Sequence, residues 1–343
     1  MASTPAQGDE ITSIFDIRRD VFSFDLAAEI CQSLKAPSLS LPSLLLWDDR
    51  GQQLFDEFSQ VPAYYPFHAE IEILNRHGAE ICRIVPPGGV LLELGCGAIR
   101  KTKSILFNFH QQRKRVHYIA LDVSPQGLNT SLSQLKSIFK DSPYISITGL
   151  IGTYDDCVTW LRGLKHHDEL NSVTIMWLGN SIANLDSKEE ASNFLHRFRS
   201  ACESSGLDCQ FIVSTDICQR INKVLDAYDL KRSTPREFFL NAARAANLAL
   251  GYDVLPADSW EPVACLDEHQ GAVVFYLEAT RNVHIVLPRA ERVLVARGDR
   301  IRLVSSGKWD EVSVDGLCAW AGFRVQQRWK DTSGDYCIFM LKK

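Results

Sequence analysis

The chain has 343 residues, of which 45% are hydrophobic, so it can bury a large core and exceeds the usual size of one domain. A formal net charge of −5 and a pI near 6.0 give no basic surface of the kind that nucleic-acid binding requires, which favours a small molecule or a peptide as partner. No apolar run approaches the roughly 18 residues of a membrane span, and residues 1–10 lack a secretory hydrophobic region, so we expect a cytoplasmic protein without membrane contact.

The N-terminal part of the chain leads to a short apolar strand and a glycine turn. We predict a flexible terminus over residues 1–14 and a helix over 71–85, which Pro86-Pro87-Gly88-Gly89 ends. The apolar run at 90–94 predicts a buried parallel strand, and Glu93-Leu94-Gly95-Cys96-Gly97 predicts a sharp turn where backbone can approach a ligand closely. Because ordinary strand-to-helix turns also contain such glycines, the motif alone is weak evidence for a ligand site.

A second apolar strand, at residues 118–122, ends in Asp122, a carboxylate suited to the two hydroxyls of a ribose. A dinucleotide fingerprint needs a third glycine, but Arg100 stands three residues after Gly97. This argues against pyrophosphate binding and an NAD-dependent oxidoreductase. The combination resembles the S-adenosylmethionine site of Rossmann-like methyltransferases, whose ligand has no phosphate to hold.

Helices and strands alternate from about residue 69 to 216, which predicts an α/β fold with a doubly wound sheet. One helix is expected where four residues form a single apolar face: Thr102, Ile105, Leu106 and Phe109. Two more helices are expected at residues 128–139 and 189–201. Further strands are expected at 144–151, 173–178 and 210–215. A helix at 309–321 and strands at 323–330 and 336–341 match the ending of a methyltransferase sheet of seven strands, the last antiparallel.

Residues 217–306 interrupt this alternation. Helices are expected there at 222–228 and 235–250, and strands at 271–278, 284–287 and 301–305. We predict that this segment and residues 15–65 form an inserted α+β substrate-binding lobe over the carboxyl edge of the sheet, where ligands of open α/β folds bind. Residues 66–216 and 307–343 would then form the S-adenosylmethionine-binding methyltransferase domain.

Three blocks carry a more specific resemblance. They are residues 47–56 with 61–66 and Glu70, residues 93–102, and Trp177-Leu178-Gly179-Asn180-Ser181-Ile182-Ala183-Asn184-Leu185. Together they closely resemble the histidine α-N-methyltransferases of the ergothioneine pathway, from about residue 41 to the C-terminus. The blocks occur in family order and at family spacing.

By that resemblance, cofactor contacts fall on Gly95, Lys101 and Asp122. We assign to the same site the neighbouring residues Glu93, Gly97, Val123, Thr153, Tyr154 and Leu178. The family usually has an acidic residue before the aromatic one after the third strand, where it suits the adenine amino group. Here a threonine takes its place, so the charge-assisted hydrogen bond is missing unless Asp155 or Asp156 supplies it. A helix-capping role for Asp122 and a solvated Lys101 are the simpler alternatives.

The resemblance also implies the residues that hold an amino acid. Asn184 and Tyr228 match the amide and the phenol that hold its carboxylate, Tyr64 matches a side chain that lines the pocket, and Gly179 and Ser181 match positions close to the amine. The aromatic side chains Trp47 and Phe55 belong to the same pocket.

One substrate position departs from histidine chemistry. Histidine-specific members bind the imidazole with a Glu and a Ser two residues apart, and Val304 and Ser306 stand at these positions here. Without the acid, a buried imidazole would lose its partner, which disfavours histidine. Phe275 replaces a methionine and Trp47 a tyrosine, and the added aromatic surface favours an indole. We therefore expect α-N-methylation of L-tryptophan, with prenylated tryptophan and L-histidine as alternatives.

Methyl transfer needs a neutral amine lone pair in line with the sulfonium methyl and yields S-adenosylhomocysteine. No strong base is required, since water can take the ammonium proton while Tyr64, Ser181 and the Gly179 carbonyl orient the nitrogen. The ten cysteines include no Cys-x-x-Cys pair, so neither metal nor disulfides are indicated. We expect a monomer whose partner is a small molecule, a free amino acid. A silent methyltransferase-like binding scaffold is the alternative of a different class.

Overall fold

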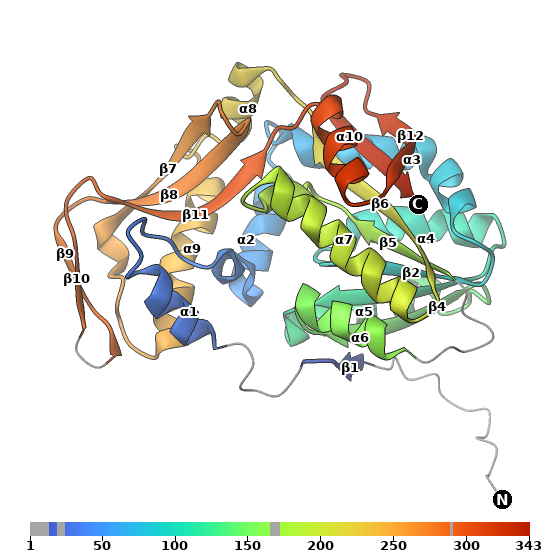
Figure 1. The fold of residues 1–343 in the computed structure, drawn as a ribbon, viewed down its shortest axis with the longest axis horizontal. Coiled ribbons are helices and arrows are strands. Elements are labelled where there is room, and N and C mark those ends of the chain that lie inside the picture. Colours follow the sequence, from blue (N-terminus) through green and yellow to red (C-terminus); the bar gives the residue numbers. More distant parts are fainter. Residues whose placement is uncertain (1–13, 19–24, 165–171, 289–290) are drawn as a thin grey trace, which may run out of the picture.

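The computed structural model describes residues 14–18, 25–164, 172–288 and 291–343, which build a large helix-covered sheet with a second lobe beside it (Figure 1). Eight strands form the large sheet in the order β1 (Ile14–Asp16), β4 (Ile145–Ile151), β3 (Val116–Asp122), β2 (Gly89–Leu94), β5 (Ser172–Trp177), β6 (Asp208–Asp216), β13 (Tyr336–Lys342) and β12 (Arg324–Lys330). The first six are parallel, whereas β13 is antiparallel to both its neighbours. The predicted Rossmann-like methyltransferase sheet is confirmed.

Strand β1 adds an eighth strand to the seven that the sequence predicts. Its three residues pair in parallel with Gly149 to Ile151 of β4 at the edge of the large sheet. Residues 15 and 16 therefore belong to this sheet, and not to the lobe to which residues 15–65 were assigned. Three residues are too few to show a hydrophobic period, so sequence analysis cannot recognise such a strand.

Helices cover both faces of the large sheet. On one face lie α3 (Tyr65–Ile84), α4 (Arg100–Gln111) and α5 (Pro125–Phe139), and on the other α6 (Tyr154–Gly163), α7 (Lys188–Ser204) and α10 (Glu311–Trp320). Because both faces are buried, the central strands are continuous apolar runs, and the side chains of β2 alternate between the two cores.

Capping residues explain where the helices differ from the predicted ranges. Helix α3 starts at Tyr65, well before the expected residue 71. Pro66 fits its first turn, because the backbone N–H groups there have no partner within the helix and the N–H that proline lacks is not needed. Ser124 caps α5 through the Gly127 N–H and so moves its start to Pro125. Helix α6 was not predicted; Thr153 caps it in a capping box with Asp156.

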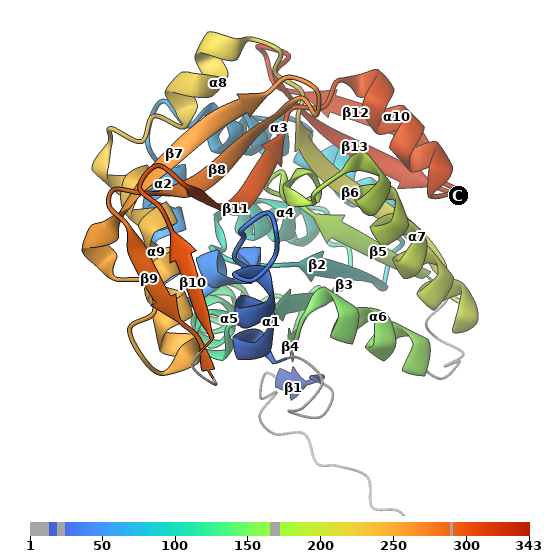
Figure 2. The same cartoon turned by 60° about the vertical axis from the view of Figure 1, so that its left-hand side comes forward.

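The second lobe combines helices with two small antiparallel sheets, one of three strands and one of two (Figure 2). Its elements are α1 (Leu26–Ser33), η1 (Ser43–Trp47), α2 (Asp49–Ser59), α8 (Ile221–Ala227), α9 (Ser233–Leu250), η3 (Ala257–Ser259), β7 (Trp260–Asp267), β8 (Ala272–Ala279), β9 (Val283–Val286), β10 (Arg292–Val295) and β11 (Arg300–Gly307). Helix α9 packs on β7 and β8, and the two N-terminal helices pack on α9. One hydrophobic core joins these segments.

Strands β7 and β10 were not predicted. Pro262 interrupts the apolar pattern of β7, yet β7 is an edge strand, where a proline removes no required hydrogen bond. Strand β10 pairs only with β9 in a short hairpin and begins at an arginine. In the described part of the chain, we find no helix with the length and apolar character needed to cross a membrane.

Candidate active site

The glycine turn and Asp122 lie together at the carboxyl ends of β2 and β3. Gly95 and Gly97 have φ of 72° and 44°, a left-handed conformation that favours glycine. The Asp122 carboxylate accepts the backbone N–H groups of Gly97 at 3.2 Å and Ser124 at 3.0 Å. It is thus held rigidly at the sheet edge, with Val123 half-buried directly after it. This turn, with its fixed carboxylate, fits a nucleoside.

Helix α2 of the lobe docks on the same edge through three polar contacts. Gln52 Nε2 donates to Asp122 Oδ1 at 2.8 Å, Asp56 accepts from Arg100 Nη2 at 3.0 Å, and Asp49 accepts from the Ser124 hydroxyl. Gln52 was not predicted as a site residue, although it lies within residues 47–56, because its partner Asp122 comes 70 residues later in the chain.

The predicted adenine side of the site lies at the start of α6. The Asp156 carboxylate accepts the Thr153 N–H and hydroxyl, both at 2.8 Å, whereas Asp155 pairs with Arg197 and is mostly exposed. Of the two acids suggested as replacements, Asp156 is therefore the one held beside Thr153. The Tyr154 hydroxyl accepts from the indole of Trp177 at 3.3 Å and lies beside Gly95, whose Cβ, if present, would be 3.4 Å from it.

Glu93 lies below this edge and makes its contacts within the protein. Its carboxylate is 3% exposed and accepts from the hydroxyls of Thr102 at 2.7 Å and Tyr118 at 2.5 Å. Burial raises the pKa of Glu93 to about 7, although the Tyr118 and Thr102 hydroxyls and the Lys101 ammonium favour its ionised form. Glu93 supports the glycine turn from beneath.

This raised pKa has a consequence for stability. Since the pKa of Glu93 lies near 7 in the folded chain and near 4.5 when unfolded, the folded protein holds an extra proton between these values. The contribution of protonated Glu93 to stability is present in full below pH 4.5 and is lost as the pH rises through 7. This loss lowers the free energy of unfolding by about 3 kcal/mol. Glu93→Gln is expected to remove this slope. Urea denaturation at pH 5 and pH 8 measures it, and parallel pH profiles of variant and wild type would contradict it.

A small cavity opens beside Leu178 and Gly179, next to the glycine turn. Its lining combines aromatic and polar side chains: Phe55, Ser59, Tyr64, Pro66, Phe67, Glu70, Lys101, Gly179 and Tyr336. Glu70 is fully buried, pairs with Lys101 Nζ at 2.5 Å and accepts the Gly179 N–H at 2.9 Å. The ion pair makes a solvated role for Lys101 untenable. Glu70 was not predicted as a site residue, because the contacts that define its position are with Lys101 and Gly179, far away in sequence.

A buried polar network lies behind this cavity and is connected to it through the contact of Tyr228 with Tyr64, a residue of the cavity lining. The Tyr228 hydroxyl lies 3.0 Å from Ser306 Oγ and 3.2 Å from Lys308 Nζ, and its ring packs edge-on against Tyr64 at 5.5 Å between centroids. Lys308 in turn is 3.2 Å from the Asp216 carboxylate. The network joins the end of β11 to the end of β6, that is, the lobe to the large sheet.

The other predicted substrate residues fall into two groups around Tyr228. Trp47 and Phe55 pack against each other at 5.1 Å and both contact Phe238. Phe275 is 2% exposed, with one ring face stacked on Phe239 at 4.1 Å and Tyr228 on another side at 5.2 Å. Val304 pairs with Phe275 across a bulge in β11. Because Phe239 and Tyr228 both pack against it, the Phe275 ring is buried and belongs to the hydrophobic core of the lobe.

The block after β5 turns sharply. Asn180 has a left-handed φ of 61° and is buried, Ser181 donates its hydroxyl to the Leu178 carbonyl at 2.8 Å, and Asn184 is half-buried at the end of η2 (Ser181–Asn184). Asn180, which was not predicted as a site residue, belongs to the network of Tyr228. Among the described residues, no group of histidine, cysteine, aspartate or glutamate side chains is arranged to hold a metal ion.

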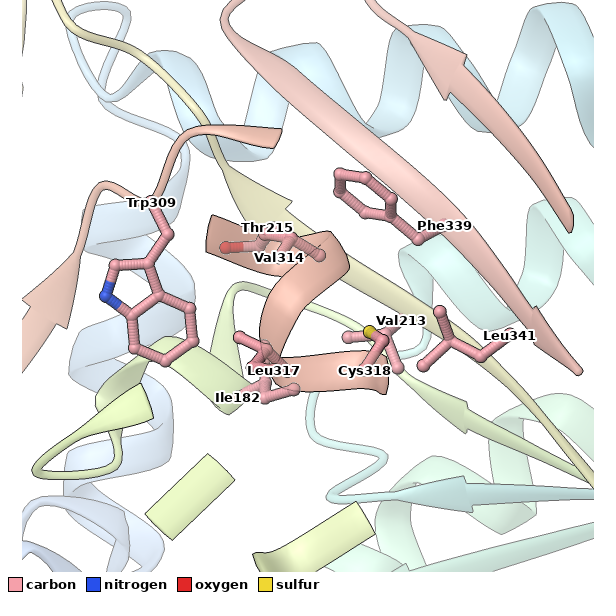
Figure 3. Close-up of a pocket in the computed structure, with 9 residues that line it drawn as sticks. All are labelled: Ile182, Val213, Thr215, Trp309, Val314, Leu317, Cys318, Phe339 and Leu341. Atoms are coloured by element: carbon pink, nitrogen blue, oxygen red, sulfur yellow. The ribbon is translucent and has the colours of Figure 1, made fainter. Parts of the chain in front are cut away.

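A second cavity lies between α10 and strands β6 and β13 (Figure 3). Apart from Thr215 its lining is apolar: Ile182, Val213, Trp309, Val314, Leu317, Cys318, Phe339 and Leu341. No titratable pair faces it, so we attach no chemistry to this cavity.

One protein-family profile and several known proteins match nearly the whole length of this chain. The profile of a family described as "Histidine-specific methyltransferase, SAM-dependent" matches residues 26–343. The N-methyltransferase benX of Aspergillus terreus is 38% identical over 331 residues, which cover 96% of this chain and 91% of that protein. The 4-dimethylallyltryptophan N-methyltransferase easF of Claviceps fusiformis is 28% identical, with 96% of each chain covered. Ergothioneine biosynthesis protein 1 of Neurospora crassa is 29% identical over 96% of this chain and 36% of its own length.

Proposed function

The chain belongs to the family of S-adenosylmethionine-dependent, histidine-specific methyltransferases, and we propose that it methylates the α-amino nitrogen of a free aromatic amino acid, L-tryptophan above others. Membership confirms the resemblance seen in the sequence, and the protein is an S-adenosylmethionine-dependent N-methyltransferase related to fungal ones. The observation that carries the amino-acid proposal is the cavity that brings Tyr64, Glu70 and Gly179 together beside the glycine turn.

The residues at the sheet edge fit the cofactor. Asp122, fixed by two backbone N–H groups, suits the ribose hydroxyls, and the left-handed glycines leave the nucleoside room. Lys101, held by Glu70, supplies a positive charge for the carboxylate of the methionine part. When bound, S-adenosylmethionine supplies an electrophilic methyl group on its sulfonium.

The residues of the cavity orient the amine. Because the Ser181 hydroxyl donates its only proton to Leu178, its oxygen is left to accept a hydrogen bond from the substrate nitrogen. Burial raises the pKa of Tyr64 well above its usual value, so this phenol stays neutral. These groups position the lone pair, and water takes the ammonium proton.

The side-chain pocket favours an indole over an imidazole. Val304 is 8% exposed and offers no charge to a protonated or hydrogen-bonding ring. An indole can pack its apolar face against Val304, and it has a single ring N–H that needs a hydrogen-bond partner. An imidazole buried there would have two ring nitrogens to pair. A relative named for 4-dimethylallyltryptophan supports a tryptophan-like substrate, with the prenylated form as the second candidate.

One assay tests the proposal directly. The purified protein is given S-adenosylmethionine with L-tryptophan, 4-dimethylallyltryptophan or L-histidine, and mass spectrometry records each methylated product. We expect the highest kcat/KM with tryptophan. Exclusive turnover of histidine would overturn the argument from Val304. Calorimetric titration with S-adenosylhomocysteine separates the enzyme from a silent scaffold, since no binding would exclude methyl transfer.

A substitution at Val304 tests the side-chain pocket. Val304→Glu places an acid against the proposed indole, so kcat/KM for tryptophan is expected to fall by at least about tenfold, equivalent to about 1.4 kcal/mol. The matched control Val304→Leu keeps the pocket apolar and should retain most of the activity. Circular dichroism confirms folding. Unchanged tryptophan kinetics in a folded Val304→Glu variant would show that Val304 lies outside the pocket.

A further inference from the structure

Lys308 is a buried cation for which the reaction above has no use. It is 6% exposed, and its Nζ lies 2.7 Å from Ser306 Oγ, 3.2 Å from Tyr228 Oη and 3.2 Å from Asp216 Oδ2. The Gly307 carbonyl is farther away, at 3.4 Å. An ammonium has three protons, so the three nearest acceptors take them all. Lys308 is therefore a donor toward both hydroxyls.

The amide of Asn180 is a second fixed donor in this network. Its Oδ1 accepts the Asp216 backbone N–H at 2.8 Å and the Thr215 hydroxyl at 2.9 Å. Because a backbone N–H can only donate, the amide orientation is set, and Nδ2 faces Ser306 Oγ at 3.1 Å.

Proton counting then fixes the direction of the remaining bonds. Ser306 Oγ accepts from Lys308 and Asn180, so both its lone pairs are used and its own proton goes to Tyr228 Oη at 3.0 Å. Tyr228 Oη in turn accepts from Ser306 and Lys308. The phenolic proton of Tyr228 has no acceptor left among Ser306, Lys308 and Asn180 and is directed away from them. Tyr64, a residue of the cavity lining, packs against the Tyr228 ring.

We infer that Lys308 is a positioning residue that acts through Ser306 to make Tyr228 a dedicated hydrogen-bond donor, and that it thereby selects substrates carrying an α-carboxylate over the corresponding amines. The inference rests on the proposed function. Asp216 balances the buried charge of Lys308 and is itself bound by the Tyr65 hydroxyl at 2.6 Å. The pair therefore adds no net charge to the site. Bonds in such a chain polarise one another, which strengthens the outermost donor.

Removing both charges together tests this without leaving a buried ion unpaired. In the double variant Lys308→Met/Asp216→Asn, Ser306 regains a free lone pair, so Tyr228 can donate inward and its proton is no longer reserved for the substrate. We expect the KM for tryptophan to rise at least tenfold, with S-adenosylhomocysteine affinity unchanged. The kcat/KM ratio of tryptophan to tryptamine, which lacks the carboxylate, is expected to fall by a similar factor.

The controls separate positioning from a merely structural role. A structural defect lowers turnover of tryptophan and tryptamine alike, so an unchanged ratio in the active double variant would overturn the inference. Tyr228→Phe is expected to lower the ratio as much, and adding the double variant to it should lower it no further. Lys188→Met, a change at an exposed lysine, should leave the ratio unchanged. A wild-type protein that methylates no amino acid would instead defeat the proposed function itself.

Discussion

Substitution of Asp122 by alanine is expected to weaken S-adenosylhomocysteine binding by at least about 100-fold, because the two proposed charge-assisted hydrogen bonds to the ribose, about 3 kcal/mol together, would be lost. The same change frees the N–H groups of Gly97 and Ser124, which the carboxylate now holds. The turn would then lose part of its fixed shape. Calorimetric titration measures the dissociation constant.

Two further variants make this result specific. Asp315→Asn removes an exposed carboxylate of α10 that pairs with Arg328, far from the glycine turn, and should not change the affinity. Gln52→Ala removes the side-chain donor to Asp122 but leaves both backbone donors, so its effect should be much smaller than that of Asp122→Ala. An Asp122→Ala protein that is folded and binds with wild-type affinity would reduce Asp122 to a capping residue.

Much of the fold could be predicted because the large sheet is buried on both sides. Its strands are mostly apolar segments between turns, which is why the expected ranges for β2 to β6 differ from the observed ones only at their ends. Elements without a clear period were missed. Strand β7 carries Pro262 at an edge position, and β1 has three residues.

The site was predicted only as far as single motifs reach. Gly95 and Asp122 follow from a strand and the turn after it, which are local features of the chain. Glu70, Asn180 and Lys308 owe their positions to partners that lie far away in sequence: a carboxylate on α3 meets Lys101 of α4, and Asp216 of β6 meets Lys308 after β11. A motif lists such residues without indicating which ones meet, since the fold alone brings them together.

The lobe and the sheet share α2, which links the two halves of the site. This helix sends Gln52 to Asp122 at the cofactor edge, while its Phe55 and Ser59 line the cavity by Gly179. A change in the position of α2 would therefore alter both the proposed cofactor site at Asp122 and the cavity by Gly179. The predicted role of the lobe as the part that holds the amino acid stays a proposal, and the Lys308 network gives it a physical connection to β6.

Glu70→Gln is expected to cost both stability and activity. The carboxylate is fully buried and is the ion-pair partner of Lys101, so its neutralisation leaves a largely buried ammonium without a counterion, at a cost of about 3 kcal/mol in the free energy of unfolding. A glutamine still accepts the Gly179 N–H, so the backbone turn itself is kept. Urea denaturation measures the loss, and Lys101→Met added to Glu70→Gln should recover part of it.

The activity of the same variant should fall further than its stability implies. In the proposed reaction, methyl transfer moves positive charge from the sulfonium to the amine inside the cavity, and Glu70 is the one carboxylate among the residues that line this cavity. We expect kcat to drop at least about 100-fold, or about 2.7 kcal/mol, at temperatures where the variant is fully folded. Glu72→Gln, on the same helix but half-buried at the surface, still accepts hydrogen bonds from Thr332 and Arg76 and should lose less than about 1 kcal/mol of stability and no activity. If the folded Glu70→Gln variant kept the wild-type kcat, Glu70 would have only a structural role in the cavity. It would then not stabilise the positive charge of the transition state.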